Sequence, residues 1–164
     1  MIFIRAIKVN GKKAAAIGGH AIVDAARFKE FSQFHWLVNA DGYPFRIVWE
    51  NGKRRTVYMH QVINQTPEGF QSDHKNGVRH FNWAKNLRTA TKAQNQQNKP
   101  KQQTPTSSRF KGVSWHAKAQ KWEAYIAING KKVYLGLFDS ECAAADCYDT
   151  AAKKYFGEFA LLNA

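Results

Sequence analysis

The stretch QSDHKNGVRHFNWAKNLRTATKAQNQQNK, residues 71–99, decides the fold and the chemistry of this chain. In it, Asp73 and His74 are followed by Asn86 and Asn95. Metal-assisted phosphodiester hydrolysis needs an imidazole that takes a proton from water and oxygen ligands that hold a hard cation. His74 is the candidate base, and Asp73 and Asn95 are the candidate ligands of Mg²⁺ or Mn²⁺. Asn86 is the second candidate catalytic residue, because its amide oxygen could accept a hydrogen bond from the second ring nitrogen and fix the tautomer.

The same stretch predicts a strand, a loop, a second strand and a helix. FQSDH (70–74) is the first strand, Asn76-Gly77 opens the loop, and NLRTA (86–90) and TKAQNQQNK (91–99) are the second strand and the helix. In this arrangement the helix carries Asn95 towards the end of the first strand, where the aspartate and histidine lie.

Composition points to a polyanionic partner. The formal net charge is +13, and 44% of the residues are hydrophobic, which is enough for packed cores. No apolar run approaches the ~20 residues of a spanning helix, so nucleic acid is favoured over a membrane. The N-terminus does not resemble a signal peptide, and we expect a cytoplasmic protein. Cys142 and Cys147 are expected to be small buried helix residues without a disulfide, and the lack of a Cys-x-x-Cys pair argues against zinc.

Four segments follow from the pattern along the chain. QQNKPKQQTPTSS (96–108) is polar, contains two prolines and is typical of a linker. We therefore expect a β-rich N-terminal region (1–57), a metal finger (58–99), a linker (100–108) and a C-terminal domain (109–164). The whole chain is predicted to be an α+β protein.

Two hairpins are predicted in the β-rich region. FIRAIKV pairs with KKAAAI around Asn10-Gly11, and YPFRIVWE pairs with KRRTVYMH around Asn51-Gly52, because Asn-Gly favours a two-residue turn. Between them, residues 23–36 predict a short amphipathic helix. The basic side chains of the second hairpin are either solvated charges or phosphate contacts, and the net charge favours phosphate contacts. They are Arg46, Lys53, Arg54 and Arg55.

The C-terminal domain is predicted to be three strands followed by a helix. RFKGVSWH, KWEAYIAI and KKVYLGLF alternate apolar and polar residues, and the helix runs from the N-cap Ser140 to Phe156 with Gly157 as its stop. The helix covers one face of the sheet. The other face carries basic and aromatic side chains that could enter a major groove, or it is an ordinary solvated face.

Residues 20–99 resemble the HNH endonuclease family, in the form found in phage and intron-borne homing enzymes. The resemblance rests on YMHQVIN (58–64), DHKNG (73–77), NLR (86–88) and QNQQN (94–98). It implies a ββα-metal fold that cuts DNA with a divalent cation, in a bacterial or phage-infected host cell. His74 then matches the general base, Asp73 and Asn95 match the metal ligands, and Asn86 matches the loop asparagine. His60 also matches a family histidine, and either a packing role or support of the site fits it.

Residues 109–163 resemble the APETALA-type or ethylene-response-factor DNA-binding domain, through FKGVSW, KWEAYI and the segment from YLGLF to ALLN. That family reads the major groove with its sheet. Several family arginines are replaced here, and lysine lacks the bidentate fork of arginine, so the sequence preference should differ. The matching positions are Lys111, Ser114, His116, Glu123, Tyr125, Ala127, Lys132 and Tyr134.

These features predict a metal-dependent DNA endonuclease of the homing or nicking type, targeted to double-stranded DNA by its C-terminal sheet. One finger carries one metal site, and a monomer is favoured. A non-catalytic DNA-binding regulator and an RNA-directed nuclease are the alternatives. The intact Asp73, His74, Asn86 and Asn95 argue against the first, and a sheet built for the wide major groove argues against the second.

Overall fold

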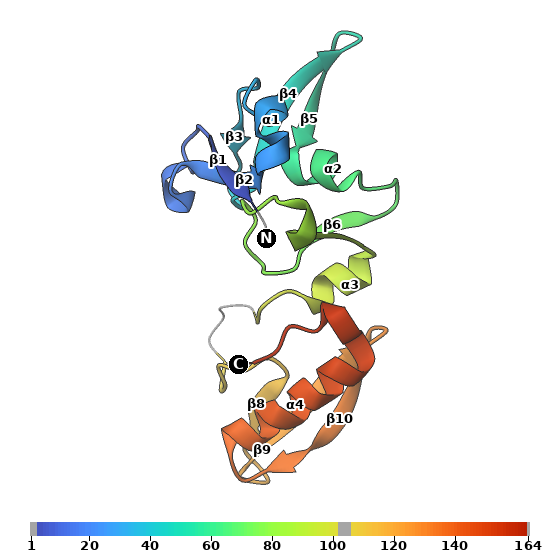
Figure 1. Cartoon of the computed structure of the whole chain (residues 1–164). Helices are drawn as coiled ribbons and strands as arrows, with labels where there is room; N and C mark the ends of the chain where they lie inside the picture. The colour runs from blue at the N-terminus through green and yellow to red at the C-terminus, as the bar shows by residue number, and fades with distance from the viewer. Residues whose placement is uncertain (1–2, 102–105, 164) are drawn as a thin grey trace. The chain divides into compact units, whose positions relative to one another are not determined.

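In this computed structural model, which describes residues 3–101 and 106–163, ten strands form four small antiparallel sheets and the fold is α+β (Figure 1). The chain divides into an N-terminal unit, Met1–Lys92, and a C-terminal unit, Ala93–Ala164. The division falls inside helix α3 (Lys92–Gln97), ahead of the linker that composition indicates. Part of that linker, residues 102–105, lies outside the described residues.

The first predicted hairpin is wrong in its second strand. β1 (Ile4–Lys8) pairs with β2 (His20–Asp24), and Ala15–Ile17 is a 3-10 helix in the connection. The segment that forms β2 places Ala21 and Val23 in the core with no exposure, whereas the alanine-rich segment 12–17 has no comparable apolar alternation. The predicted helix 23–36 shrinks to a 3-10 turn (Ala25–Arg27) and α1 (Phe28–Phe31).

The second predicted hairpin is confirmed. β4 (Pro44–Glu50) pairs with β5 (Lys53–Tyr58), with the short β3 (Leu37–Val38) on the other side of β4. Asn51 and Gly52 have φ of 51° and 73°, the positive values that a two-residue hairpin turn of the primed type requires.

Helix α2 (Met59–Asn64) follows β5 directly, where the sequence suggested that the strand continues through His60. Met59 and Ile63, four residues apart, are buried on one side of this single helical turn and a half. Burial of that pair against the core decides the conformation, and it places His60 on a helix.

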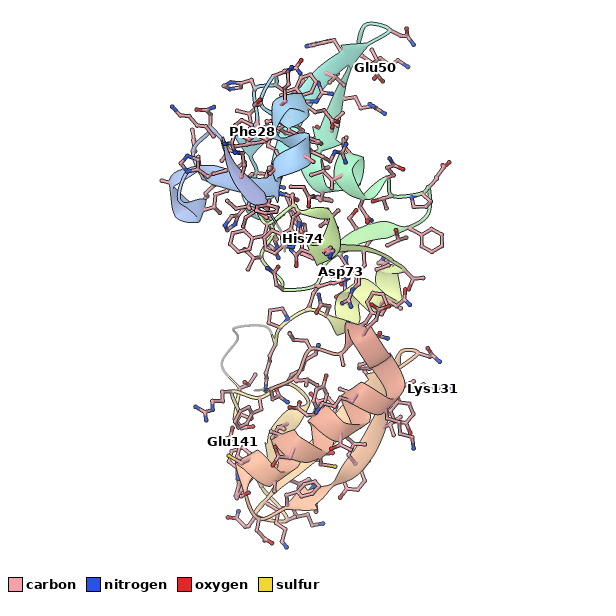
Figure 2. All side chains as sticks on the ribbon, viewed as in Figure 1. Phe28, Glu50, Asp73, His74, Lys131 and Glu141 are labelled. Atoms are coloured by element: carbon pink, nitrogen blue, oxygen red, sulfur yellow. The ribbon has the colours of Figure 1, made fainter. Side chains whose placement is uncertain are left out.

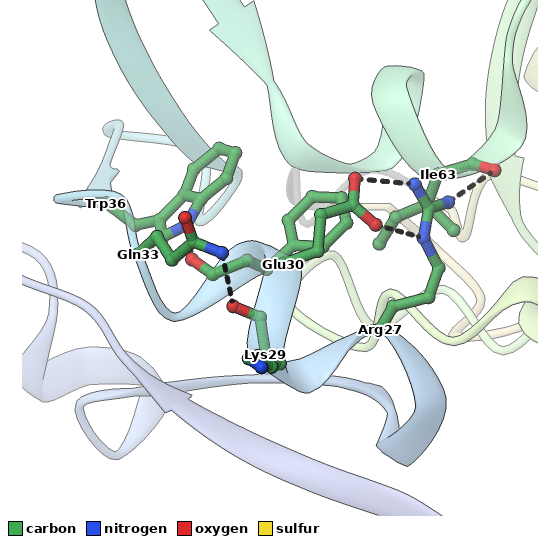
Figure 3. Close-up of polar contacts among 7 residues, drawn as sticks. Arg27, Lys29, Glu30, Gln33, Trp36 and Ile63 are labelled. Atoms are coloured by element: carbon green, nitrogen blue, oxygen red, sulfur yellow. Dashed lines mark hydrogen bonds and ion pairs between the residues drawn. The ribbon is translucent and has the colours of Figure 1, made fainter.

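Arg27 fixes the end of α2 (Figure 3). Its guanidinium donates to the carbonyl oxygen of Ile63 at 3.4 Å and to both carboxylate oxygens of Glu30 at 2.9 and 3.0 Å. In the same segment, Gln33 donates to the carbonyl oxygen of Lys29 at 3.1 Å. The short helix α1 thereby orients the element that carries His60.

The core of the N-terminal unit is shared by the β-rich region and the expected finger. Its residues come from both sides of the boundary expected at residue 57, so the two segments form one packed body. The buried members are Ile7, Val9, Ala21, Val23, Phe31, Trp36, Val38, Met59, Ile63 and Leu87.

The C-terminal unit confirms the predicted sheet and helix. The strands β8 (Val113–His116), β9 (Lys121–Ile128) and β10 (Lys131–Phe138) lie in the order β10-β9-β8. Helix α4 (Glu141–Phe156) packs on one face, with Ser140 Oγ accepting from the Ala143 amide at its start and Gly157 at its end. Cys142 on α4 is exposed, so its expected burial is wrong.

Gly112 allows the close packing of β8 and α4. A Cβ at this position would lie 2.1 Å from the Tyr148 ring and 2.5 Å from the Tyr125 carbonyl oxygen. Its φ of 72° also favours glycine. Tyr148 can therefore lie directly on the backbone at the start of the sheet.

Among the described residues, no helix is long and apolar enough to cross a membrane.

Candidate functional site

Asp73 and His74 lie at the end of β6 (Gln71–His74), which pairs with β7 (Leu87–Ala90) (Figure 2). Each side chain belongs to a residue that is only 4% exposed. The hairpin register places Asp73 opposite Arg88 and His74 opposite Leu87. A buried carboxylate and a buried imidazole require partners, and the structure supplies them from β7 and from the loop between the strands.

Arg88 neutralises Asp73. The Nε and Nη2 atoms of Arg88 each lie 2.7 Å from Oδ2 of Asp73, and the two side chains are 9% and 5% exposed. The guanidinium thereby gives the buried carboxylate a charged hydrogen-bond partner. Arg88 was not among the predicted site residues, although the pairing of the two predicted strands would have placed it opposite Asp73.

Asn82 holds the His74 ring. Its Oδ1 atom lies 3.1 Å from His74 Nε2, and the residue is completely buried. Since the amide oxygen accepts, Nε2 carries the proton and Nδ1 presents the lone pair. The backbone N–H of Asn82 also donates to the carbonyl oxygen of Ile22 at 2.6 Å, which anchors the loop to β2.

The expected hydrogen bond between Asn86 and His74 is wrong. Asn86 Oδ1 accepts from the Asn76 amide at 3.2 Å, and its Nδ2 donates to Asn76 Oδ1 and to the Phe81 carbonyl oxygen at 3.0 and 2.7 Å. Both donor protons are used inside the loop. Asn86 therefore braces the loop that carries Asn82 and reaches the histidine only through it.

Burial determines the protonation of His74. Desolvation lowers the pKa of His74, and the hydrogen bond to Asn82 acts in the opposite direction. The ring lies among aromatic neighbours, with centroids 5.9 Å from Tyr43 and 5.4 Å from His60. A neutral imidazole, the form that can accept a proton, is therefore favoured at neutral pH.

His60 is a buried neutral member of the same cluster. Its ring stacks on Tyr58 at 5.4 Å and tilts against Tyr43 at 5.1 Å. Burial, with a smaller contribution from His74, lowers the pKa of His60 to about 3. Its Nδ1 atom is buried without a hydrogen-bond partner among the described residues. His60 thus packs against His74 as a neutral ring at neutral pH.

Arg79 places a positive charge in the loop near His74. Its Nη1 donates to the carbonyl oxygen of Asp41 at 2.6 Å, and its guanidinium lies 5.1 Å from the Tyr43 ring centroid. Its charge contributes to lowering the pKa of His74. The side chain is 43% exposed, so this cation is accessible from solvent. Arg79 was not among the predicted site residues, because its position depends on how the loop folds back.

Asn95 lies on α3, beyond the point where the chain divides. Its place beside Asp73 therefore stays a prediction from the spacing. Within residues 3–101 and 106–163, no group of three or more His, Cys, Asp or Glu side chains could hold a metal ion. A carboxylate and an amide oxygen are ligand types that suit Mg²⁺ or Mn²⁺, so a site for such a cation also stays a prediction.

The basic residues of the β4–β5 hairpin fall into two groups. The Arg46 guanidinium lies 3.9 Å from the Phe34 ring centroid and 5.9 Å from that of Trp36, with its Nε buried. It packs on aromatic rings. In contrast, Lys53, Arg54 and Arg55 are exposed at the tip, and Arg55 forms an ion pair with Glu50 at 3.2 Å.

The open face of the C-terminal sheet carries most of the expected residues. On it, Lys132 lies over the Tyr125 ring at 4.0 Å and forms an ion pair with Glu123 at 3.2 Å, and Tyr134 is 59% exposed. The register pairs Ser114 with Glu123 and Tyr134 with Tyr125, which places them on the same face, and His116 follows on β8 at the same alternation.

Lys111 was expected on the first strand of the C-terminal sheet, but it does not lie on that strand. It precedes β8, is half-buried, and its Nζ donates to the carbonyl oxygens of Gln97 at 2.6 Å and Lys99 at 2.7 Å. Burial lowers the pKa of Lys111. It satisfies carbonyl groups at the C-terminal end of α3, a position where a cation is favourable.

Comparison with known proteins covers both units. The chain is 30% identical over 149 residues to an uncharacterized HNH endonuclease of Acanthamoeba polyphaga mimivirus, covering 89% of this chain and 75% of that protein. No family model matches the chain.

A second group of similar proteins matches only the C-terminal part. The chain is 46% identical over 57 residues to an AP2-like ethylene-responsive transcription factor of Arabidopsis thaliana and to APETALA2-like protein 2 of Oryza sativa. These matches cover 35% of this chain and only 12% and 13% of the plant proteins.

Proposed function

Because this chain belongs to the HNH endonuclease family and also carries a C-terminal AP2-like part, we propose that it is a metal-dependent DNA endonuclease that its C-terminal sheet directs to duplex DNA. The observation that supports this best is the state of His74. It is buried, its Nε2 atom is held by Asn82, and its pKa is lowered, which are the properties of a general base.

In the proposed reaction, His74 Nδ1 accepts a proton from the attacking water. Asn82 keeps the other ring proton on Nε2, so that the lone pair on Nδ1 has a fixed direction. Asn86 holds the loop in the shape that brings Asn82 to the ring. The uncharged ring of His60 excludes water from one side of the His74 ring, which favours the neutral imidazole before the reaction begins.

Asp73 and Asn95 are the residues that would hold the cation. Arg88 contacts Oδ2 of Asp73 through two nitrogen atoms and so fixes the position of the carboxylate that would hold the cation. A bound Mg²⁺ would supply positive charge to the scissile phosphate and to the leaving oxygen. Arg79 is placed to contact a phosphate oxygen near His74, because it is partly exposed and cationic.

The direct experiment is incubation of supercoiled plasmid with the purified protein and Mg²⁺, with and without a chelator. We expect nicked circles that require the metal. His74→Ala should remove nicking while leaving the affinity for a DNA duplex within about twofold, since a buried general base makes no contact that positions DNA. Metal-independent nicking, or nicking by the variant, would contradict the assignment.

The alternative of a DNA-binding regulator with an inactive finger gives a different result. Such a protein binds the duplex in the presence of chelator and produces no nicks with either Mg²⁺ or Mn²⁺. A duplex RNA competitor in the same assay separates the RNA-directed alternative, because the A-form groove does not admit the sheet.

A further inference from the structure

The tip of the β4–β5 hairpin carries an aromatic side chain that the N-terminal core does not use. Trp49 is 71% exposed, and its ring has no ring, cation-π or hydrogen-bond contact with another described residue. Exposure of an indole ring to water is unfavourable, and its burial against a partner would lower the free energy. Lys53, Arg54 and Arg55 follow on the facing strand of the same hairpin tip, so the partner that buries Trp49 should be negatively charged.

The hairpin register selects Arg54 as the companion of Trp49. The two residues are directly opposite and share a face, whereas Arg55 lies on the other face in an ion pair with Glu50. Arg54 is exposed and has no ion pair among the described residues. An exposed ring and an unpaired guanidinium side by side match a base step and its neighbouring phosphate.

The face of Trp49 leads back to His74 within the same unit. Along β4 and β5 this face also carries Ile47 with Thr56 and then Phe45 with Tyr58. Tyr58 stacks on His60 at 5.4 Å, and His60 lies 5.4 Å from His74. Figure 2 shows Glu50, next to Trp49, at the hairpin tip and away from His74.

The length of this path sets the expected contact. Four residues of strand span about 14 Å, and two ring-to-ring steps of 5.4 Å bring the path to about 25 Å at most. At 3.4 Å per base pair this is about seven base pairs. A duplex cut at His74 would therefore pass the tip of the hairpin.

We propose that Trp49 is a DNA-wedge residue, which inserts its ring at a base step within about seven base pairs of the cut while Arg54 binds the adjacent phosphate. The proposal rests on the proposed action on duplex DNA. It adds a contact that distorts the helix, a type of contact that provides preference for easily unstacked steps such as TA and CA. Three consecutive basic residues at the tip favour DNA over a second copy of this chain, whose net charge is also positive.

The first test measures binding alone. A mixed-sequence 40-base-pair duplex is titrated in chelator with the full chain, with Trp49→Ala, Trp49→Phe and Arg54→Ala, and with the control Phe70→Ala, which removes another exposed aromatic ring, 49% exposed. Trp49→Ala should weaken binding about tenfold, as the loss of one base-stacking side chain does, and Trp49→Phe should weaken it much less. Phe70→Ala should leave the affinity unchanged.

The second test locates the ring. Single 2-aminopurine substitutions are placed one at a time along the 40-base-pair duplex, and the rise in their fluorescence reports local unstacking. The full chain should give a rise at one or two adjacent positions that Trp49→Ala abolishes. Equal affinity and an unchanged fluorescence profile for Trp49→Ala would overturn the proposal. A Trp49-dependent dimer seen by sedimentation without DNA would also overturn it.

The two failures are distinguishable. Nicking without any effect of Trp49 refutes the wedge and leaves the nuclease intact. Trp49-dependent unstacking in a protein that does not nick supports the wedge and refutes the nuclease.

Discussion

At the residue scale, the site depends on hydrogen bonds that fix one imidazole. Asn82 holds the His74 ring, Asn86 braces the loop that carries Asn82, and Arg88 holds the Asp73 carboxylate. Each partner belongs to the strand opposite or to the intervening loop. The spacing of Asp73, His74 and Asn86 was visible in the sequence, but the identity of the residue that contacts the ring was not.

Replacement of Asn82 should affect catalysis without affecting DNA binding. Asn82→Ala removes the acceptor of the Nε2 proton, while its backbone amide can still donate to Ile22. Loss of such a supporting contact typically costs about 10- to 100-fold in activity. We expect a slower nicking rate by that factor at saturating DNA, with unchanged duplex affinity. A variant that nicks at the wild-type rate would show that Asn82 only fills space.

His60 should make the N-terminal unit sensitive to acid. Its pKa is about 3 when folded and near 6.5 when unfolded, so the unfolded state binds the proton more readily. Stability is therefore complete above about pH 6.5 and falls as the pH drops towards 3, by about 2 kcal/mol at pH 5 from this residue.

The measurement compares pH 7 with pH 5. The urea dependence of amide exchange in α2 and β7 gives the free energy of unfolding of that unit at each pH. His60→Phe, which does not titrate, should lose about 2 kcal/mol less than the wild type between the two values. An equal loss in both proteins would mean that other groups cause the acid sensitivity.

At the element scale, hairpin turns and helix ends follow local rules, while the close approach of elements follows packing. The Asn51-Gly52 turn and the Ser140 cap formed as the sequence indicated. The position of Gly112 under the Tyr148 ring, in contrast, exists only because α4 lies on the sheet.

Gly112→Ala should destabilise the C-terminal unit strongly. The added methyl group overlaps the Tyr148 ring and the Tyr125 carbonyl oxygen, and the left-handed backbone is unfavourable for alanine. Together these costs come to about 3 kcal/mol or more. Gly130→Ala is the matched control, since its φ is 78° and nothing lies within 4 Å, so it should cost only about 1–2 kcal/mol. Amide exchange in β9 measures both, and equal losses would rule out the overlap.

At the scale of the whole molecule, the question is whether the open face of the C-terminal sheet directs the proposed nuclease to DNA. Truncation after residue 106 would remove the sheet, but it would also remove Lys111, which binds carbonyl groups at the end of α3. A loss of DNA binding by the truncated protein would therefore not distinguish the role of the sheet face from the support of α3. Substitutions on the sheet face separate them.

The double variant Lys132→Ala, Tyr134→Ala should lose preference among DNA sequences and bind a target duplex about tenfold or more weakly. Metal-dependent nicking of plasmid at high protein concentration should persist, because these side chains lie on β10 and not in the N-terminal unit. Lys153→Ala, at an exposed position of α4, removes the same charge and should change binding little. Equal effects of the two changes would indicate a general charge effect in place of a reading surface.

The sequence by itself determined the residue types and their local pattern. Alternation gave the strands of the C-terminal sheet and the second hairpin, and the spacing of polar residues gave Asp73 and His74 as the centre of the site. These signals are local, since each depends on neighbours within a few positions.

Only the tertiary structure decided which distant residues meet. It paired β1 with β2, turned Met59 and His60 into a helix, and brought Asn82 to the imidazole in place of Asn86. It also placed Lys111 at the end of α3 and not on the open face of the C-terminal sheet, where the sequence predicted it. The physical reason is common to these cases: burial of apolar side chains chooses among several locally acceptable partners, and the buried polar groups then bind whatever partner that packing brings within reach.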